Sequence, residues 1–491
     1  MILKLFYHIK YAFTIVFLKK HCIFSKNVLF FAIFYIFSNM KKFYDNFNRI
    51  YFSGVLGVSM SGLCKHALVL GKTVGGSDLN VGNVKTDLAD LGIALYRDNL
   101  EENISAFKPD ALVYTSAIYQ SNQEIRYAIE KGIPFIKRSV FLNECIKGYK
   151  KRIGVCGSHG KTTTTAMLAH CLINEGLDPT VFLGGEDTSF GNYRYGKGDL
   201  ALVEACEYQK NFLDIDVNYS IVLNIDNDHL ESYKGMDEMV KAFNDFSSNG
   251  LSVINADDEN SKSLCGLSSV TFGINNQATY MAKKISYNGK GYSFSLFRNG
   301  VAKTRIELAV EGKHNIYNAL SVCAMADILG ISLSTVKETL KNFSGVKRRM
   351  EKIGYLNGIE CITDYAHHPR EIKATLEALK QTAKKDLIIF QPHTYSRTKM
   401  LLEDFTNELK KADKLIIYKT YPARESYDVE GSSDRLFVEI KKSGENKVYH
   451  AEDEKMLKEC INQFKNQIER IVFLGAGDIY SVANKLVEKN I

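Results

Sequence analysis

Short apolar runs alternate along most of the chain with segments in which apolar positions recur every three or four residues. Short apolar runs bounded by glycine or polar residues are typical of buried strands, whereas the second pattern is typical of helices with one buried face. Strands that alternate with helices predict α/β layers built on parallel sheets. A chain of 491 residues has room for about three such domains.

The order of the motifs described below divides the chain into four segments. A hydrophobic N-terminal extension over residues 1–47 precedes three domains, over 48–149, 150–344 and 345–491. The fold class that we predict is α/β, with a Rossmann-like N-terminal domain, a central P-loop ATPase domain with a mostly parallel sheet, and a Rossmann-like C-terminal domain.

The N-terminal extension contains two apolar runs, Tyr11–Leu18 and Val28–Phe37. Neither approaches the roughly 20 residues that a membrane-spanning helix needs, and no small-residue cleavage site of a signal peptide follows them. We expect Met40 to be the functional start and the segment before it to be spurious or dispensable, with a membrane anchor as the alternative. A membrane partner is therefore not expected, and we predict a cytoplasmic protein.

Composition and charge exclude several classes of protein. A net charge of +7 is small for this length, and no block or stripe of basic residues predicts nucleic-acid binding. The ten cysteines form no CxxC pair and lack zinc-finger spacing. We expect the cysteines to be reduced and buried. We also expect the protein to be a monomer or a weak homodimer.

A glycine-rich turn follows the first predicted strand, Arg49–Phe52, and an acidic residue ends the second strand. This order is typical of half a nucleotide-binding Rossmann unit, in which a diphosphate approaches the backbone near a helix that we expect from Ser61. A tight turn without a ligand remains the alternative. The candidate residues for a phosphate-bearing ligand are Gly54, Gly57, Ser61, Gly62, Asp78 and Ser116.

The second domain opens with a strand, Arg152–Cys156, a glycine loop and a helix. The loop resembles a phosphate-binding P-loop, although Val155 occupies its first glycine position. Backbone N–H groups of such a loop hold phosphate, Lys161 reaches the β and γ oxygens, and Thr162 can bind Mg²⁺. The predicted nucleotide contacts in this loop are Gly157, Ser158, His159, Gly160, Lys161, Thr162 and Thr163.

Polar residues follow the other strands of the second domain. Glu204 and Glu207 follow the strand Leu200–Val203, and Asp226, Asp228 and His229 follow the strand Ser220–Ile225. The carboxyl ends of parallel strands are where α/β sheets bind ligands, so these residues are candidates for a Mg²⁺ and phosphate site. A later helix begins at His314 and Asn315, which either cap that helix or face a nucleotide.

In the third domain four predicted strands end in polar loops, and three of these loops carry histidine or arginine. Such loops on a rigid sheet are where binding groups gather. The loops lie at residues 364–369, 391–398, 421–425 and 475–478.

The loop Gly157–Thr165, His229, the helix start at His314, and the segment Asp364–Pro369 together resemble the Mur ligases of peptidoglycan synthesis. The resemblance extends from about residue 48 to the end of the chain. The double histidine after Ala366 is similar to the alanine-adding and the tripeptide-recycling members, and residues 391–398 resemble the alanine-adding one.

This resemblance implies an ATP-dependent ligase that uses Mg²⁺ and joins L-alanine to the carboxylate of UDP-N-acetylmuramate through an acyl phosphate. It implies that the first domain binds the UDP-sugar, that Lys161, His229, His367 and Arg397 are catalytic, and that His314, Asn315 and Arg349 bind ATP. It also implies Mg²⁺ ligands and an amino-acid site. The implied Mg²⁺ ligands are Thr162, Glu204 and His229, and the implied amino-acid site is Tyr365, His367, His393 and Arg397.

Three alternatives remain at this stage. A murein-peptide recycling ligase of the same family would share most of these motifs. A P-loop ATPase of another class would have a strand that ends in aspartate where Glu204 stands, and would leave the third domain without a role. A nicotinamide-dependent oxidoreductase would need a GxGxxG turn, which the residues after Gly54 do not form.

Overall fold

The computed structural model describes residues 46–82, 86–115, 118, 121–226, 232–264, 268–443 and 447–488. The predicted extension over residues 1–47 lies almost wholly outside this part of the chain. Among the helices of the described residues, none combines the length and the apolar character that crossing a membrane requires.

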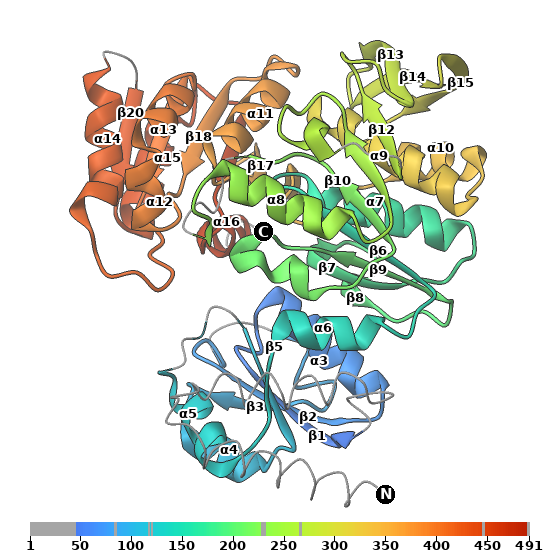
Figure 1. Ribbon diagram of the computed structural model, residues 1–491. Coiled ribbons are helices and arrows are strands. Elements are labelled where there is room, and N and C mark those ends of the chain that lie inside the picture. Colours follow the sequence, from blue (N-terminus) through green and yellow to red (C-terminus); the bar gives the residue numbers. More distant parts are fainter. Residues whose placement is uncertain are drawn as a thin grey trace, which may run out of the picture. The chain divides into compact units, whose positions relative to one another are not determined.

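The first domain is a five-stranded parallel sheet in the order β3-β2-β1-β4-β5. Its helices contact one another in two pairs, α3 with α6 and α4 with α5, on opposite faces of the sheet (Figure 1). This arrangement confirms the predicted Rossmann-like fold. The strands are β1 Arg49–Ser53, β2 Thr73–Asp78, β3 Ala94–Arg97, β4 Ala111–Tyr114 and β5 Phe135–Lys137, and the helices are α3 Val58–Val69, α4 Glu101–Phe107, α5 Gln123–Lys131 and α6 Arg138–Ile146.

The predicted start of α3 at Ser61 is wrong, because the helix begins at Val58. Gly57 caps it in an extended conformation, and its carbonyl accepts the first helical hydrogen bond from the Ser61 N–H. The turn from β1 into the helix is therefore shorter than the sequence indicated.

The central domain has a ten-stranded sheet in the order β15-β14-β13-β12-β11-β10-β6-β9-β7-β8. The middle of this sheet is parallel and consists of β13, β12, β11, β10, β6, β9 and β7. Antiparallel strands extend it at both edges: β14 and β15 beyond β13, and β8 beyond β7. The strands are β6 Lys151–Cys156, β7 Thr180–Asp187, β8 Gly191–Arg194, β9 Leu200–Glu204, β10 Tyr219–Val222, β11 Leu251–Asn255, β12 Ser269–Gly273, β13 Tyr280–Tyr287, β14 Tyr292–Arg298 and β15 Val301–Glu307.

Helices α7 and α9 pack against each other and against this sheet, and their apolar residues form the largest part of the domain core. The helical elements are α7 Lys161–Asn174, the 3-10 helix η2 Tyr208–Asp214, α8 Met236–Ser247, the 3-10 helix η4 Ser261–Leu264, α9 His314–Leu329 and α10 Leu333–Asn342.

Strand β10 ends at Val222, although the apolar run predicted a strand as far as Ile225. The backbone leaves the sheet because Asn224 bonds to the loop after β6. Its carbonyl accepts from the Ser158 N–H at 3.1 Å, and its side-chain oxygen accepts from the His159 N–H at 2.8 Å. A tertiary contact therefore replaces the predicted end of the strand.

The third domain has a six-stranded sheet in the order β16-β17-β21-β18-β19-β20, parallel except for β16. The strands are β16 Glu351–Leu356, β17 Ile359–Asp364, β18 Asp386–Phe390, β19 Lys414–Tyr418, β20 Lys447–Ala451 and β21 Arg470–Leu474. The helices are α11 Pro369–Lys380, α12 Tyr395–Met400, α13 Leu402–Leu409, the 3-10 helix η5 Val429–Gly431, α14 Ser433–Lys442, α15 Glu454–Phe464 and α16 Ile479–Glu488.

The sheet orders decide which loops become neighbours. Strand β6 lies between β9 and β10, and β21 lies between β17 and β18. Parallel neighbours present their carboxyl ends at one edge, so the polar loops that follow these strands gather there.

The segment between the second and third sheets follows a strained path. Arg348 and Met350 adopt left-handed backbone conformations, with φ of 59° and 50°, which non-glycine residues rarely adopt. Two backbone hydrogen bonds stabilise this conformation. The Lys347 N–H donates to the Glu186 carbonyl at 2.9 Å, and the Tyr365 N–H donates to the Arg348 carbonyl at 2.7 Å. Arg349 lies between these anchors.

Candidate active site

The glycine loop between β6 and α7 has a backbone that glycine makes possible. Gly157 and Gly160 have φ of 142° and 85°, in the region that side chains disfavour. A Cβ on Gly157 would lie 2.9 Å from the Cβ of Leu223. Strand, tight loop and helix N-terminus thus form the geometry that binds phosphate oxygens.

Lys161 is folded back over this loop. Its Nζ donates to the carbonyl of Ser158 at 3.1 Å and pairs with Glu207 at 2.9 Å. Burial disfavours the charged ammonium, but the negative charge of Glu207 outweighs burial and raises the pKa of Lys161. The ammonium therefore remains charged at the position where phosphate would enter.

Thr162 and Glu204 come together as predicted for two ligands of one cation. The Thr162 hydroxyl donates to Glu204 Oε1 at 3.1 Å, and Gly184 N–H donates to Glu204 Oε2 at 2.8 Å. A Cβ on Gly184 would lie 2.6 Å from the Glu204 carboxylate, so this close approach requires glycine. Hydroxyl and carboxylate oxygens fit Mg²⁺. His229, the third predicted ligand, lies outside the described residues.

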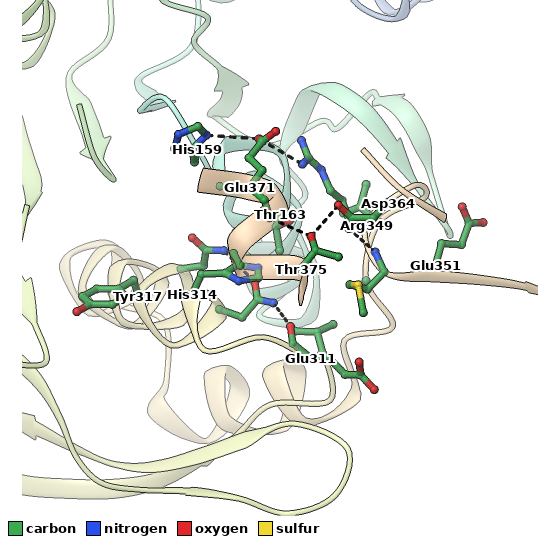
Figure 2. A pocket seen from close by; sticks show the side chains of 18 of the residues that line it. His159, Thr163, Glu311, His314, Tyr317, Arg349, Glu351, Asp364, Glu371 and Thr375 are labelled. Atoms are coloured by element: carbon green, nitrogen blue, oxygen red, sulfur yellow. Dashed lines mark hydrogen bonds and ion pairs between the residues drawn. The ribbon is translucent and has the colours of Figure 1, made fainter. Parts of the chain in front are cut away.

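A cavity of about 1180 Å³ opens beside the loop (Figure 2). Residues of α9 line it on one side, and residues of the segment before β16 and of α11 line it on the other. Its volume is sufficient for a nucleotide. Labelled lining residues are His159, Thr163, Glu311, His314, Tyr317, Arg349, Glu351, Asp364, Glu371 and Thr375.

The start of α9 presents two predicted nucleotide contacts to this cavity. Asn315 donates from its amide to the Glu311 carbonyl at 2.6 Å and accepts from Asn318 at 2.9 Å, so its orientation is defined. Burial, with the nearby charge of Arg349, lowers the pKa of His314 to about 4. His314 is therefore neutral near pH 7, as suits a contact with an uncharged base.

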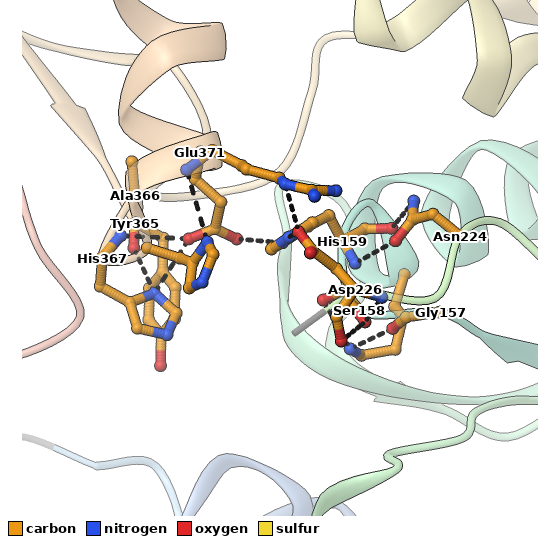
Figure 3. A network of polar contacts seen from close by, with 12 residues as sticks. Gly157, Ser158, His159, Asn224, Asp226, Tyr365, Ala366, His367 and Glu371 are labelled. Carbon is orange, nitrogen blue, oxygen red and sulfur yellow. Dashed lines mark hydrogen bonds and ion pairs between the residues drawn. The ribbon is translucent and has the colours of Figure 1, made fainter. Parts of the chain in front are cut away.

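His159 connects the loop to the third domain (Figure 3). Its Nε2 lies 3.0 Å from Asp226, and its Nδ1 lies 3.4 Å from Glu371 in α11. Arg370 also reaches Asp226, at 3.0 Å. Two carboxylates and two basic groups thus form one chain of contacts from the loop to α11.

The protonation of His159 makes the stability of the protein depend on pH. Burial disfavours the charged ring, but hydrogen bonds to Asp226 and Glu371 outweigh burial and raise its pKa to about 9. Because the folded pKa exceeds the unfolded value of about 6.5, this contribution is complete below about pH 6.5 and is lost as the pH rises through about 9. We expect His159→Gln to lower the free energy of unfolding by about 2–3 kcal/mol near pH 6 and by far less above pH 9.

Urea unfolding of parent and variant across this range measures the difference. If His159→Gln lowered the free energy of unfolding equally near pH 6 and above pH 9, the His159 ring would not be protonated in the folded protein.

The predicted amino-acid site comes together at the edge of the third sheet. The rings of Tyr365 and His367 lie 5.3 Å apart, and those of His367 and His393 lie 5.8 Å apart. The Arg397 guanidinium, in α12, lies 3.4 Å from Nδ1 of His393. His393 also stacks on Tyr421, with ring centroids 5.5 Å apart. Two chain segments thus place an arginine beside two histidines, an arrangement that can bind a carboxylate and an amine.

The structure divides the predicted residues of the first domain into two groups. Gly54 and Gly57 form the turn after β1, and the Asp78 carboxylate accepts from the backbone N–H groups of Leu56 at 3.3 Å and Asn80 at 3.0 Å. Ser116 lies outside the described residues.

Ser61 and Gly62 face β8 of the central domain. The Ser61 hydroxyl accepts from the Asn192 amide at 2.8 Å, and a Cβ on Gly62 would lie 3.5 Å from Tyr193. These two residues pack one domain against another.

Glu371 was not among the predicted site residues, and Asp226 was predicted only as one of several candidates for a Mg²⁺ and phosphate site. Glu371 stands three residues after His368, which caps α11 with its side chain. A glutamate in the first turn of a helix is common because it favours the positive end of the helix dipole, and the sequence offers no sign of its contacts with distant histidines. Asp226 stood among several strand-end acids, and its contacts with His159 and Arg370 distinguish it.

Comparisons with known proteins account for all three domains. Residues 49–150 match the model of the Mur ligase family catalytic domain, 155–326 that of the Mur ligase middle domain, and 348–477 that of the Mur ligase glutamate ligase domain. The UDP-N-acetylmuramate–L-alanine ligase of Caldanaerobacter subterraneus is 40% identical over 456 residues, which cover 91% of this chain and 98% of that protein. The chain belongs to the Mur ligase family. The family resemblance read from the motifs is thereby confirmed.

Other Mur ligases are also similar to this chain, in sequence or in fold. The UDP-N-acetylmuramate–L-alanine ligase of Clostridium acetobutylicum is 40% identical over 462 residues, 91% of this chain and 98% of that protein. The crystal structure of UDP-N-acetylmuramate-alanine ligase from Thermotoga maritima is 32% identical, with a TM-score of 0.78 over 90% of this chain and 99% of that one. A murein peptide ligase from Psychrobacter arcticus shares the fold, with a TM-score of 0.69 at 23% identity.

Proposed function

We propose that this protein is an ATP-dependent ligase that joins L-alanine to the carboxylate of UDP-N-acetylmuramate in peptidoglycan synthesis. One observation carries the proposal: the Glu371 carboxylate contacts both His159 of the phosphate-binding loop and His367 of the cluster of histidine and arginine, so the two sites are neighbours. The names of the relatives at 40% identity support the choice of substrates. An ATP-consuming reaction on a nucleotide sugar places the enzyme in the cytoplasm. The domain bounds that we propose are 48–149, 150–344 and 345–491.

The chemistry requires activation, because a carboxylate is a poor electrophile until one of its oxygens becomes a good leaving group. In the proposed reaction the carboxylate attacks the γ-phosphate of ATP, and ADP leaves. The resulting acyl phosphate is attacked by the amine of L-alanine, and inorganic phosphate leaves. Cations are needed because the first step brings two anions together.

The residues divide this work among them. We propose that the loop residues 157–163 hold the phosphates, with Lys161 beside the γ-phosphate, and that His314, Asn315 and Arg349 contact the nucleotide. Mg²⁺ held by Thr162 and Glu204 would neutralise charge on the phosphates.

The substrate sites are the other part of the proposal. The turn at Gly54 and Gly57 with Asp78 would bind the UDP-sugar. The amino-acid site would consist of Tyr365, His367, His393 and Arg397, with the guanidinium on the carboxylate of the amino acid.

The test is ADP release from the full chain with ATP, Mg²⁺, UDP-N-acetylmuramate and each of the twenty amino acids in turn. We expect release that requires the UDP-sugar and is highest with L-alanine. UDP-N-acetylglucosamine, which lacks the carboxylate, is the matched control and should give no release above background.

Release with a murein tripeptide and none with L-alanine would contradict the proposal in favour of a recycling ligase. Release without any UDP-sugar would favour a P-loop ATPase of another class.

A further inference from the structure

Glu371 occupies the junction of the two parts of the proposed site (Figure 3). It lies in the first turn of α11, and its side chain is only 14% exposed. One carboxylate oxygen lies 3.4 Å from the ring of His159, and the other accepts from the His367 N–H at 3.1 Å. The second oxygen also lies 3.1 Å from Nδ1 of His367. A single carboxylate therefore contacts the phosphate-binding loop and the amino-acid site.

The contacts of His367 define which of its nitrogens carries a proton. Nδ1 lies 3.0 Å from the carbonyl oxygen of Tyr365 and 3.1 Å from the Glu371 carboxylate. Both neighbours can only accept, so Nδ1 carries hydrogen and donates. In the neutral ring the lone pair is then on Nε2, which can accept a proton.

His393 has the opposite arrangement. Its Nδ1 lies 3.4 Å from the Arg397 guanidinium, which can only donate, so Nδ1 accepts and Nε2 carries the hydrogen. Of the two histidines in the amino-acid site, His367 is thus the one arranged to accept a proton.

We propose that Glu371 is a positioning residue that holds His367 with Nε2 available to accept the proton of the attacking amine. The proposal rests on the ligase function proposed above and deepens it. The amine nitrogen forms a bond to the acyl carbon, the bond from that carbon to the phosphate oxygen breaks, and inorganic phosphate leaves. The alanine ammonium first loses one proton to solvent, which gives the neutral amine. As that amine attacks, a second N–H proton moves to Nε2 of His367, which later releases it to solvent.

The groups around His367 favour this role. The Glu371 carboxylate is the anion in contact with the His367 ring. The rings of Tyr365 and His393 also contact the His367 ring. The guanidinium of Arg349 lies over the Tyr365 ring, and that of Arg397 contacts His393. Burial opposes the ionisation of Glu371, but His367 and His159 outweigh burial and hold the pKa of this carboxyl well below its usual range. Glu371 is therefore charged, and it stabilises the imidazolium that forms when the proton arrives.

The experiment compares two nucleophiles in the full-length protein and in the Glu371→Gln variant. L-Alanine enters largely as an ammonium ion and must lose protons, whereas hydroxylamine is unprotonated near pH 7 and attacks acyl phosphates without a base. We expect Glu371→Gln to lower kcat with L-alanine about 100-fold. The rate of hydroxamate formation from UDP-N-acetylmuramate and ATP should change less than about threefold, because positioning of the base no longer matters.

The matched control is Glu377→Gln, since Glu377 is exposed on the same helix. It should leave both rates unchanged.

Each other outcome overturns the proposal. Equal losses with both nucleophiles would mean that Glu371 acts in the phosphorylation step or in folding, and an unchanged kcat would mean that it has no role. If Glu371→Gln does not fold, as judged by thermal melting, Glu371→Asp keeps the charge and must show the same selective loss with L-alanine at a smaller size. Parent protein that gives no hydroxamate would instead contradict the proposed ligase function itself.

Discussion

Replacement of Lys161 with alanine is expected to reduce ADP release by at least about 1,000-fold, which corresponds to about 4 kcal/mol of transition-state stabilisation. The physical reason is the position of the ammonium, which is folded over the loop and charged. No other described cation lies within hydrogen-bond distance of both the loop carbonyls and Glu207. The measurement is the kcat for ADP release at saturating UDP-N-acetylmuramate and L-alanine.

Replacement of Lys161 is also expected to lower the stability of the protein, and a double variant separates this effect from the loss of catalysis. Glu207 is 1% exposed, and removing Lys161 leaves its charge buried without this partner. Such a loss costs about 3–5 kcal/mol of stability. The double variant Lys161→Ala with Glu207→Gln should regain most of the stability and none of the activity, as measured by urea unfolding and ADP release.

Lys150→Ala is the control for a lost surface charge, because the Lys150–Asp199 pair is exposed on both sides. This variant should change neither the free energy of unfolding nor the rate of ADP release measurably. Activity in the double variant close to that of the parent would exclude Lys161 from phosphoryl transfer.

Replacement of Arg397 with alanine is expected to lower kcat/KM for L-alanine by about 1,000-fold, since a charge-assisted pair with a carboxylate contributes several kcal/mol when water is excluded. Arg397→Lys should recover only part of this loss, because an ammonium cannot form two parallel hydrogen bonds with a carboxylate. The KM for ATP should stay within about threefold of the parent value, since Arg397 lies among the residues of the third sheet edge and not in the nucleotide cavity.

Lys399 provides the matched control, because it is a cation on the same short helix and its side chain is 54% exposed. Lys399→Ala should leave the kinetics with L-alanine unchanged. If Arg397→Ala raised the KM for ATP and that for L-alanine equally, the guanidinium would belong to the nucleotide site and not to the amino-acid site.

Local patterns were sufficient for much of the fold and for the phosphate-binding loop. The bounds of strands β1, β6 and β9 lie within one residue of those that their apolar runs predicted, and α9 begins at His314 as expected. The loop from Gly157 was readable because its strand, glycines, lysine and helix are contiguous in the chain. Patterns failed where a distant contact decided the outcome. Strand β10 stops at Val222 because Asn224 bonds to the loop after β6.

Helix α3 shows the same limit in the first domain. Ser61 and Gly62 resembled part of a ligand-binding turn, but both lie inside the helix and face Asn192 and Tyr193 of the central domain. A sequence pattern cannot distinguish a small residue that admits a ligand from one that admits a neighbouring domain, because both require the same close approach.

The sequence by itself determined the α/β class, the order of the three sheets along the chain, and the residue types that can hold phosphate, a cation and an amino acid. These properties follow from local periodicity and contiguous motifs. Only the tertiary structure decided the order of strands within each sheet, and thereby which loops meet. It alone placed Glu371 between His159 and His367, and it alone decided that Nδ1 of His367 carries the proton. The physical reason is that a hydrogen bond between side chains 212 positions apart depends on how whole domains pack, and no local pattern records that packing.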